Sequence, residues 1–141
     1  MSKAASIVIA AVVIVGAIAG IWYLRLPQTQ YKMRHNYASF YKVASTRLKP
    51  GMSYEEVTSM LGPGEPVTGD NHERLLKIVP DAPQLFPDGL LPSDSVVAYP
   101  VGKLTYMNLY FRNGALINFV PSQFDTPEEF KSRGTGQPPQ R

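Results

Sequence analysis

The chain has 141 residues, room for one domain, and its charged residues make up 18%, below the usual quarter. It has no cysteine, which excludes disulfides, thiolate metal sites, a cysteine nucleophile and a lipid-modified N-terminal cysteine. The formal net charge of +3 is unevenly distributed, because residues 1–54 hold seven Lys or Arg side chains and no acid. A general nucleic-acid-binding protein would spread basic side chains over its folded surface. We therefore expect no nucleic-acid partner and a basic N-terminal third beside anionic membrane lipid.

Residues 4–24 form an uncharged apolar run that predicts a membrane-spanning helix. As a helix, these 21 residues rise about 31 Å, enough to cross the hydrocarbon core of a bilayer. Trp22 and Tyr23 stand at its end, where interfacial aromatic side chains belong, and Arg25 follows. We assign residues 1–25 to a transmembrane anchor.

The alternative is a cleavable signal peptide, because Ala17-Ile18-Ala19 resembles a cleavage site with small residues. A retained anchor is favoured, since Lys3 is the single basic side chain before the run and apolar residues continue past Ala19. Gly16 and Gly20 form a GxxxG strip, which lets a second helix approach closely. The strip fits another membrane protein or complex as partner, although glycine is also common in membrane helices.

Residues 26–47 are predicted to be a basic juxtamembrane connector, in which Lys and Arg alternate with aromatic residues. Tyr37, Phe40, Tyr41 and Leu48 share one helical face, so we expect a short amphipathic helix over residues 37–48. Its basic side chains suit either the lipid surface or an ordinary solvated face.

The stretch LKPGMSYEEVTSMLGPGEP, residues 48–66, predicts a turn followed by a capped helix. Pro50-Gly51 fits a type II turn. Ser53 and Glu56 have the spacing of a capping box, with Met52 and Val57 at the hydrophobic staple positions. Val57, Met60 and Leu61 follow at helical spacing, and Gly62 ends the helix before Pro63.

Residues 62–71 are predicted to be a loop, and the apolar run at residues 75–79 is compatible with a strand or a helix. Residues 80–95 contain four prolines and predict a long irregular loop. Its apolar side chains are costly to leave in water, so we expect the loop to dock on its own domain or on a partner. They are Leu85, Phe86, Leu90 and Leu91.

Strands are predicted at residues 95–99, 103–112 and 115–120. Asn113-Gly114 predicts a type I′ hairpin turn between the last two. Across it we expect the facing pairs Phe111–Leu116, Met107–Val120 and, on the other side of the sheet, Tyr110–Ile117. Residues 125–129 predict a cap with Pro127 at the first helical position and a short helix through Phe130, and residues 133–141 predict a disordered tail.

No catalytic, cofactor or metal site is predicted. His35 and His72 lack metal-ligand spacing, and the polar cluster Asp70–Glu73 is explained by a cap or loop. Glu55 and Glu56 are adjacent and diverge on a helix, while Gly62-Pro63-Gly64 lacks the GK[ST] of a phosphate loop. We expect the protein not to be an enzyme.

The GM[ST]xxEVxxxLG spacing of residues 51–62 resembles the SmpA/OmlA (BamE-like) family, with similarity over roughly residues 40–120. The motif residues are Gly51, Met52, Ser53, Glu56, Val57, Leu61 and Gly62. Tyr110–Gly114 resembles that family's aromatic strand and hairpin, including Asn113 and Gly114. The resemblance implies an α+β domain at residues 48–132, with two helices against a three-stranded antiparallel sheet. Well-known members of the family are lipoproteins that help assemble outer-membrane β-barrel proteins.

These features predict a membrane-tethered, non-enzymatic protein-interaction module, with a role in envelope or outer-membrane protein assembly. The alternative is an accessory structural subunit of an integral membrane complex. Arg25, Lys32 and Arg34 outnumber Lys3 plus the amino terminus, which places the domain in the cytoplasm by the positive-inside rule. The family resemblance places the domain outside the cytoplasm, and we favour this side. The apolar run then makes the chain a single-pass protein of the inner membrane.

Overall fold

A computed structural model describes residues 2–78, 89–117 and 125–134. Within these residues the helices are α1 (Lys3–Arg25), α2 (Pro27–Arg34), α3 (Tyr37–Arg47), α4 (Tyr54–Leu61), α5 (Gly69–Ile78) and α6 (Pro127–Gly134). The strands are β1 (Glu65–Pro66), β2 (Ser95–Pro100), β3 (Tyr106–Arg112) and β4 (Ala115–Leu116). The fold is α+β with an N-terminal apolar helix, as the sequence predicts.

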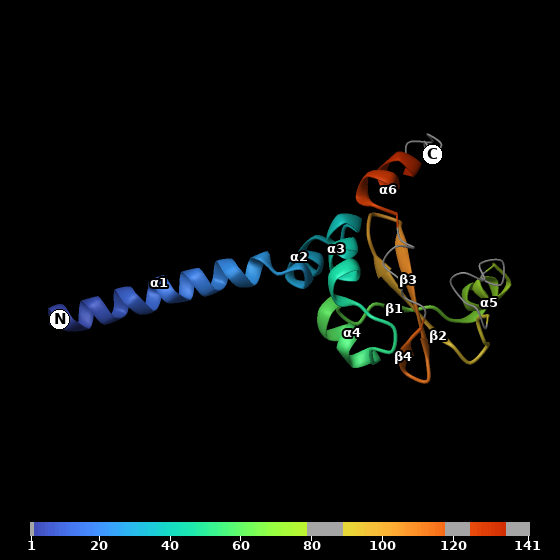
Figure 1. Ribbon diagram of the computed structural model, residues 1–141, viewed down its shortest axis with the longest axis horizontal. Coiled ribbons are helices and arrows are strands. Elements are labelled where there is room, and N and C mark those ends of the chain that lie inside the picture. The colour runs from blue at the N-terminus through green and yellow to red at the C-terminus, as the bar shows by residue number, and fades with distance from the viewer. Residues whose placement is uncertain (1, 79–88, 118–124, 135–141) are drawn as a thin grey trace.

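The elements follow one another in layers along the long axis of the molecule (Figure 1). α1 extends alone from one end, and α2, α3 and α4 form the next layer. The sheet lies on the side of this helical layer opposite to α1, and α5 lies at the far end of the molecule from α1. The sheet therefore has one face toward the anchor and one face away from it.

The sheet is four-stranded and antiparallel, with the order β1-β2-β3-β4. β2 and β3 pair along their length, from Ser95 opposite Phe111 to Pro100 opposite Tyr106. The chain reverses between them through a turn in which the Val101 N–H donates to the Thr105 carbonyl at 2.9 Å. This turn explains why β3 begins at Tyr106 and not at Lys103, where the sequence placed its start.

The hairpin between β3 and β4 has the predicted turn. Asn113 and Gly114 have φ angles of 52° and 77°, as a type I′ turn requires at both central residues. Phe111 lies opposite Leu116, and the Ile117 N–H donates to the Tyr110 carbonyl at 2.9 Å, so the predicted register is confirmed. The predicted Met107–Val120 pair lies outside the described residues.

The core occupies the face of the sheet toward the anchor. Its sheet residues are Val97, Tyr99, Val101, Leu109, Phe111 and Leu116. The helical layer and its connections contribute Tyr31, Tyr37, Phe40, Val43, Ala44, Leu48, Val57 and Leu61. Aromatic rings meet edge to face, with the Tyr31 and Phe40 centroids 5.7 Å apart, a geometry favoured by the ring quadrupoles.

Residues 26–47, which the sequence suggested as a connector, form part of this core. The predicted amphipathic helix is present as α3, and its face with Tyr37 and Phe40 is turned to the core. Tyr31 of α2 is fully buried and donates a hydrogen bond to the Pro100 carbonyl at 2.8 Å. The packing of these aromatic side chains joins α2 and α3 to the domain as one unit.

The predicted turn and capped helix are also present. The Met52 N–H donates to the Lys49 carbonyl at 3.3 Å, and Gly51 between them has φ of 86°. Ser53 and Glu56 form a reciprocal capping box, and α4 ends at Gly62 with φ of 88°. Met52 packs against the core that contains Val57.

The expected count of two helices and three strands was too low. The predicted loop at residues 62–71 contains β1, because Glu65 and Pro66 pair with β2 as an added edge strand. The apolar run left open between strand and helix belongs to α5 as far as Ile78. α6 has the predicted Pro127 start but continues past Phe130 to Gly134, so residues 133 and 134, predicted as the start of the disordered tail, belong to this helix. Leu90 is buried as expected and Leu91 is exposed, while Leu85, Phe86 and residues 135–141 lie outside the described residues.

We expect Gly64→Ala to destabilise the domain more than Gly69→Ala, as measured by denaturant unfolding of the chain in detergent micelles. The two glycines have similar φ angles, +64° and +60°, so both variants carry a backbone cost of about 1–2 kcal/mol. A Cβ at Gly64 would lie 2.5 Å from Val97 Cγ1 and 2.9 Å from Tyr99 Cζ, whereas a Cβ at Gly69 meets nothing within 4 Å. Overpacking adds about 1–3 kcal/mol at Gly64 alone. Equal losses would show that β1 does not pack closely on β2.

Candidate functional site

α1 is long and apolar enough to span a membrane, and it is the one such helix within the described residues. Its 23 residues rise about 34 Å. None of them is buried by the rest of the chain, and Trp22 at its end is 73% exposed. Gly16 and Gly20 lie on this helix, and a Cβ built on either meets no atom within 4 Å. The predicted helix-packing strip is therefore open.

The two predicted family motifs, residues 51–62 and 110–114, lie side by side in the structure. The Gly51 N–H donates to the Leu116 carbonyl at 2.7 Å, and the Leu116 N–H donates to the Met52 carbonyl at 2.8 Å. The Tyr54 N–H donates to the Gly114 carbonyl at 3.0 Å. The start of α4 is thus bonded along β4. These residues have a structural role, because the backbone N–H and carbonyl groups of the two segments form hydrogen bonds with each other.

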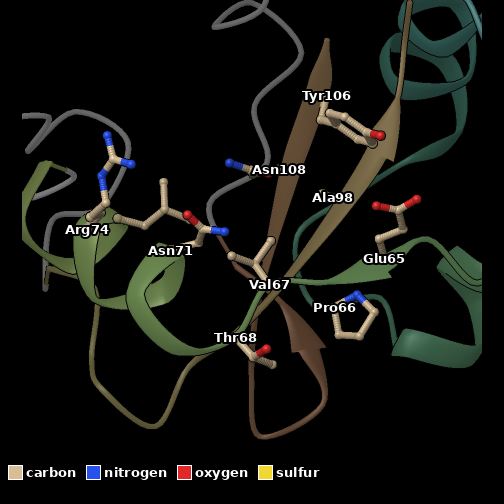
Figure 2. A pocket seen from close by; sticks show the side chains of 10 residues that line it. Glu65, Pro66, Val67, Thr68, Asn71, Arg74, Ala98, Tyr106 and Asn108 are labelled. Carbon is tan, nitrogen blue, oxygen red and sulfur yellow. The ribbon is translucent and has the colours of Figure 1, made fainter. Parts of the chain in front are cut away.

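A groove lies on the opposite face of the sheet, between α5 and the strands. Figure 2 shows Asn71 and Arg74 of α5 on one side and Ala98, Tyr106 and Asn108 of the sheet on the other. Its volume is about 520 Å³. The complete lining is Glu65, Pro66, Val67, Thr68, Asn71, Arg74, Leu75, Ala98, Tyr106 and Asn108.

The lining of this groove combines apolar and polar side chains. Val67, Leu75 and Ala98 supply apolar surface, while the Asn71 and Asn108 amides each offer donors and an acceptor. Glu65 and Arg74 lie at opposite ends in Figure 2. Such a lining can bind an extended peptide, because its Asn side chains can form hydrogen bonds with the peptide backbone and its Glu65 and Arg74 side chains can pair with peptide charges of either sign.

A second cavity of about 650 Å³ also borders residues 66–68. Tyr54 of α4, His72 of α5 and Phe111 of β3 are among its lining residues. Residues 66–68 line both spaces.

α5 is held against the sheet by a buried polar cluster. The Asp94 side chain is fully buried, and its carboxylate accepts two hydrogen bonds from the Arg112 guanidinium, at 2.9 and 2.8 Å. It also accepts the Leu91 N–H at 2.7 Å. His72 Nε2 lies 2.8 Å from the Asp94 carbonyl oxygen, which connects α5 to the same residue. The hydrogen bonds from the Arg112 side chain are the largest cause that lowers the pKa of Asp94 below its ordinary value.

Two tyrosines of the core have raised pKa values. Burial raises the pKa of Tyr99 to about 12 and raises that of Tyr31 as well, so both phenols are neutral at physiological pH. Among the described residues there is no group of three His, Cys, Asp or Glu side chains that could hold a metal ion.

Sequence reasoning missed both the groove and the Asp94–Arg112 pair. It named His72 only within a polar cluster of residues 70–73 that a cap or loop explained. The groove residues come from four separate segments, and their periodicity carries no sign of a shared surface. An acid directly before the predicted strand at residues 95–99 was the available signal for the ion pair.

We expect Arg112→Gln to destabilise the chain in micelles by about 2–4 kcal/mol, because it leaves the Asp94 carboxylate buried without a charge partner. The loss is smaller than for a completely buried pair because the Arg112 side chain is 26% exposed. In the parent chain the folded pKa of Asp94 lies below the unfolded one, near 3.9, so its stabilisation is present above that pH and is lost as pH falls through the folded pKa. The variant should therefore unfold at a higher pH than the parent in an acid titration followed by circular dichroism. Lys103→Gln, at an exposed turn residue, is the control and should leave the acid transition unchanged.

No family model, no curated protein and no solved structure matches the chain. The resemblance to the SmpA/OmlA family therefore rests on the motif residues and remains a prediction.

Proposed function

We propose that the chain is a membrane-tethered, non-enzymatic interaction module, in which α1 lies in the bilayer and the groove beside α5 receives a partner. One observation carries the proposal: α1 is a 23-residue apolar helix with no residue buried by the rest of the chain. Apolar surface costs about 25 cal/mol per Å² in water. A helix of this composition therefore needs an apolar environment, and a bilayer supplies it along the whole length.

The layer order supports the interaction role. α2, α3 and α4 lie between α1 and the sheet, so the groove opens on the side of the domain away from the anchor (Figure 1). A partner can reach it there without displacing lipid. The amides of Asn71 and Asn108 and the apolar lining residues suit an extended peptide segment of another membrane or envelope protein.

The proposed location is the inner membrane, with the domain outside the cytoplasm and a role in envelope or outer-membrane protein assembly. The support for this side is the SmpA/OmlA resemblance of residues 51–62. The excess of basic residues after α1 argues for the other side by the positive-inside rule. The experiments below therefore test both whether α1 is retained in the membrane and on which side of the membrane the domain lies.

We expect the chain to stay in the membrane fraction after carbonate washing, at the mass of the uncleaved sequence. α1 is continuous through Ala17 and Ala19, and α2 follows it after Leu26 alone. A soluble form beginning at Gly20 would establish a signal peptide and overturn the anchor.

Cysteine labelling shows on which side of the membrane the domain lies. The chain has no cysteine, so Glu73→Cys on exposed α5 gives a single labelling site. An impermeant maleimide should label it in intact cells with a permeable outer membrane. Labelling that requires lysis of the inner membrane would place the domain in the cytoplasm.

We expect a photo-crosslinking amino acid in place of Asn71, which lines the groove, to give a defined adduct in native membranes. The same amino acid in place of Glu73, an exposed residue on α5 that does not line the groove, should give none. Mass spectrometry identifies the segment attached. Equal adducts at both positions, or none at either, would contradict the groove as the partner site.

A further inference from the structure

α2 is attached directly to the end of the proposed anchor. Leu26 is at once the C-cap of α1 and the N-cap of α2, with φ of −62° and ψ of 135°. The extended backbone at this residue is what the following Pro27 demands. Because one residue separates the two helices, α2 lies where α1 leaves the bilayer, if α1 spans it as we propose.

The helical layer places one exposed apolar side chain on its outer side. Tyr31 is buried and bonded to the sheet, and Met33 lies two residues further, about 200° around α2. Met33 is accordingly 66% exposed. The side of α2 away from the sheet is the side from which α1 extends (Figure 1).

Exposed basic side chains of α2 and α3 border this outer side. Arg34 lies about 100° around α2 from Met33 and borders this side, and Lys42 lies on α3 about 200° from the buried Phe40 and Ala44; both basic residues are exposed. Lys32 is turned instead to α4, where its Nζ donates to the Ser59 carbonyl at 2.7 Å. The first acids of the chain, Glu55 and Glu56, belong to α4, and Glu56 is used in the capping box of Ser53.

We propose that the outer side of α2 and α3 rests on the bilayer surface, with Met33 among the lipid headgroups and Arg34 and Lys42 against anionic phospholipid. This inference rests on the proposed function, because it requires α1 in the bilayer. The surface fits lipid because it combines continuity with the anchor, an exposed apolar side chain and charge of one sign. Docking would hold the domain in one orientation, with the groove directed away from the membrane.

The test uses the full chain in nanodiscs and a single fluorophore on Met33→Cys, with Glu73→Cys on α5 as the distal control. Both positions are exposed, so the label should leave the fold intact, which circular dichroism checks. Spin-labelled lipid headgroups should quench the fluorophore at position 33 strongly and that at position 73 weakly. Quenching at 33 should fall when anionic lipid is replaced by phosphatidylcholine. It should also fall in 1 M salt, where the Debye length is about 3 Å, against about 10 Å at 0.1 M.

Charge variants connect the quenching to the named residues. Arg34→Gln and Lys42→Gln should each lower the docked-to-free ratio about fivefold, whereas Lys77→Gln on α5 makes the same charge change and should have no effect. Equal quenching at positions 33 and 73, or quenching at 33 that ignores lipid charge and both variants, would overturn the docking. Loss of the chain from the membrane on carbonate washing would instead overturn the proposed anchor, so the two failures are distinguishable.

Discussion

The burial of Tyr31 determines how the domain is held relative to α1. Its ring is fully buried against Phe40, and its hydroxyl donates to the Pro100 carbonyl at the end of β2. Burial raises the pKa of this phenol, so it remains a neutral donor. Because α2 is joined to α1 through Leu26 alone, fixing Tyr31 on the sheet also fixes the point at which α1 begins to extend.

The sheet separates two environments because its side chains alternate between faces. Val97 and Tyr99 of β2 enter the core toward the helical layer, while Val96 and Ala98 face the other way and are also buried. On that second face, Leu90 packs with side chains of α5, β3 and the segment after β4. The groove is the part of this face that α5 borders without filling.

The Asp94–Arg112 pair holds the border of the groove in place. Few apolar contacts attach α5 and the segment before β2 to the sheet, and Leu90 is the buried residue of that small cluster. A buried carboxylate is tolerated only when it is paired and hydrogen-bonded, and the Asp94 carboxylate accepts from both the Arg112 guanidinium and the Leu91 N–H. Since the Asp94 carbonyl also meets His72, the position of α5 depends on the same residue.

The sequence by itself determined the features set by near neighbours: the apolar length of α1, the capping box of Ser53, the Asn113-Gly114 turn and the register that the turn imposes. Each of these depends on residues within a few positions, so local pattern suffices. Only the tertiary structure decided that α2 and α3 belong to the core, that β1 joins the sheet, and that Asn71 and Asn108 face one groove. Periodicity shows that a helix has an apolar face and gives no information on what covers it, because that depends on how segments far apart in the chain pack together.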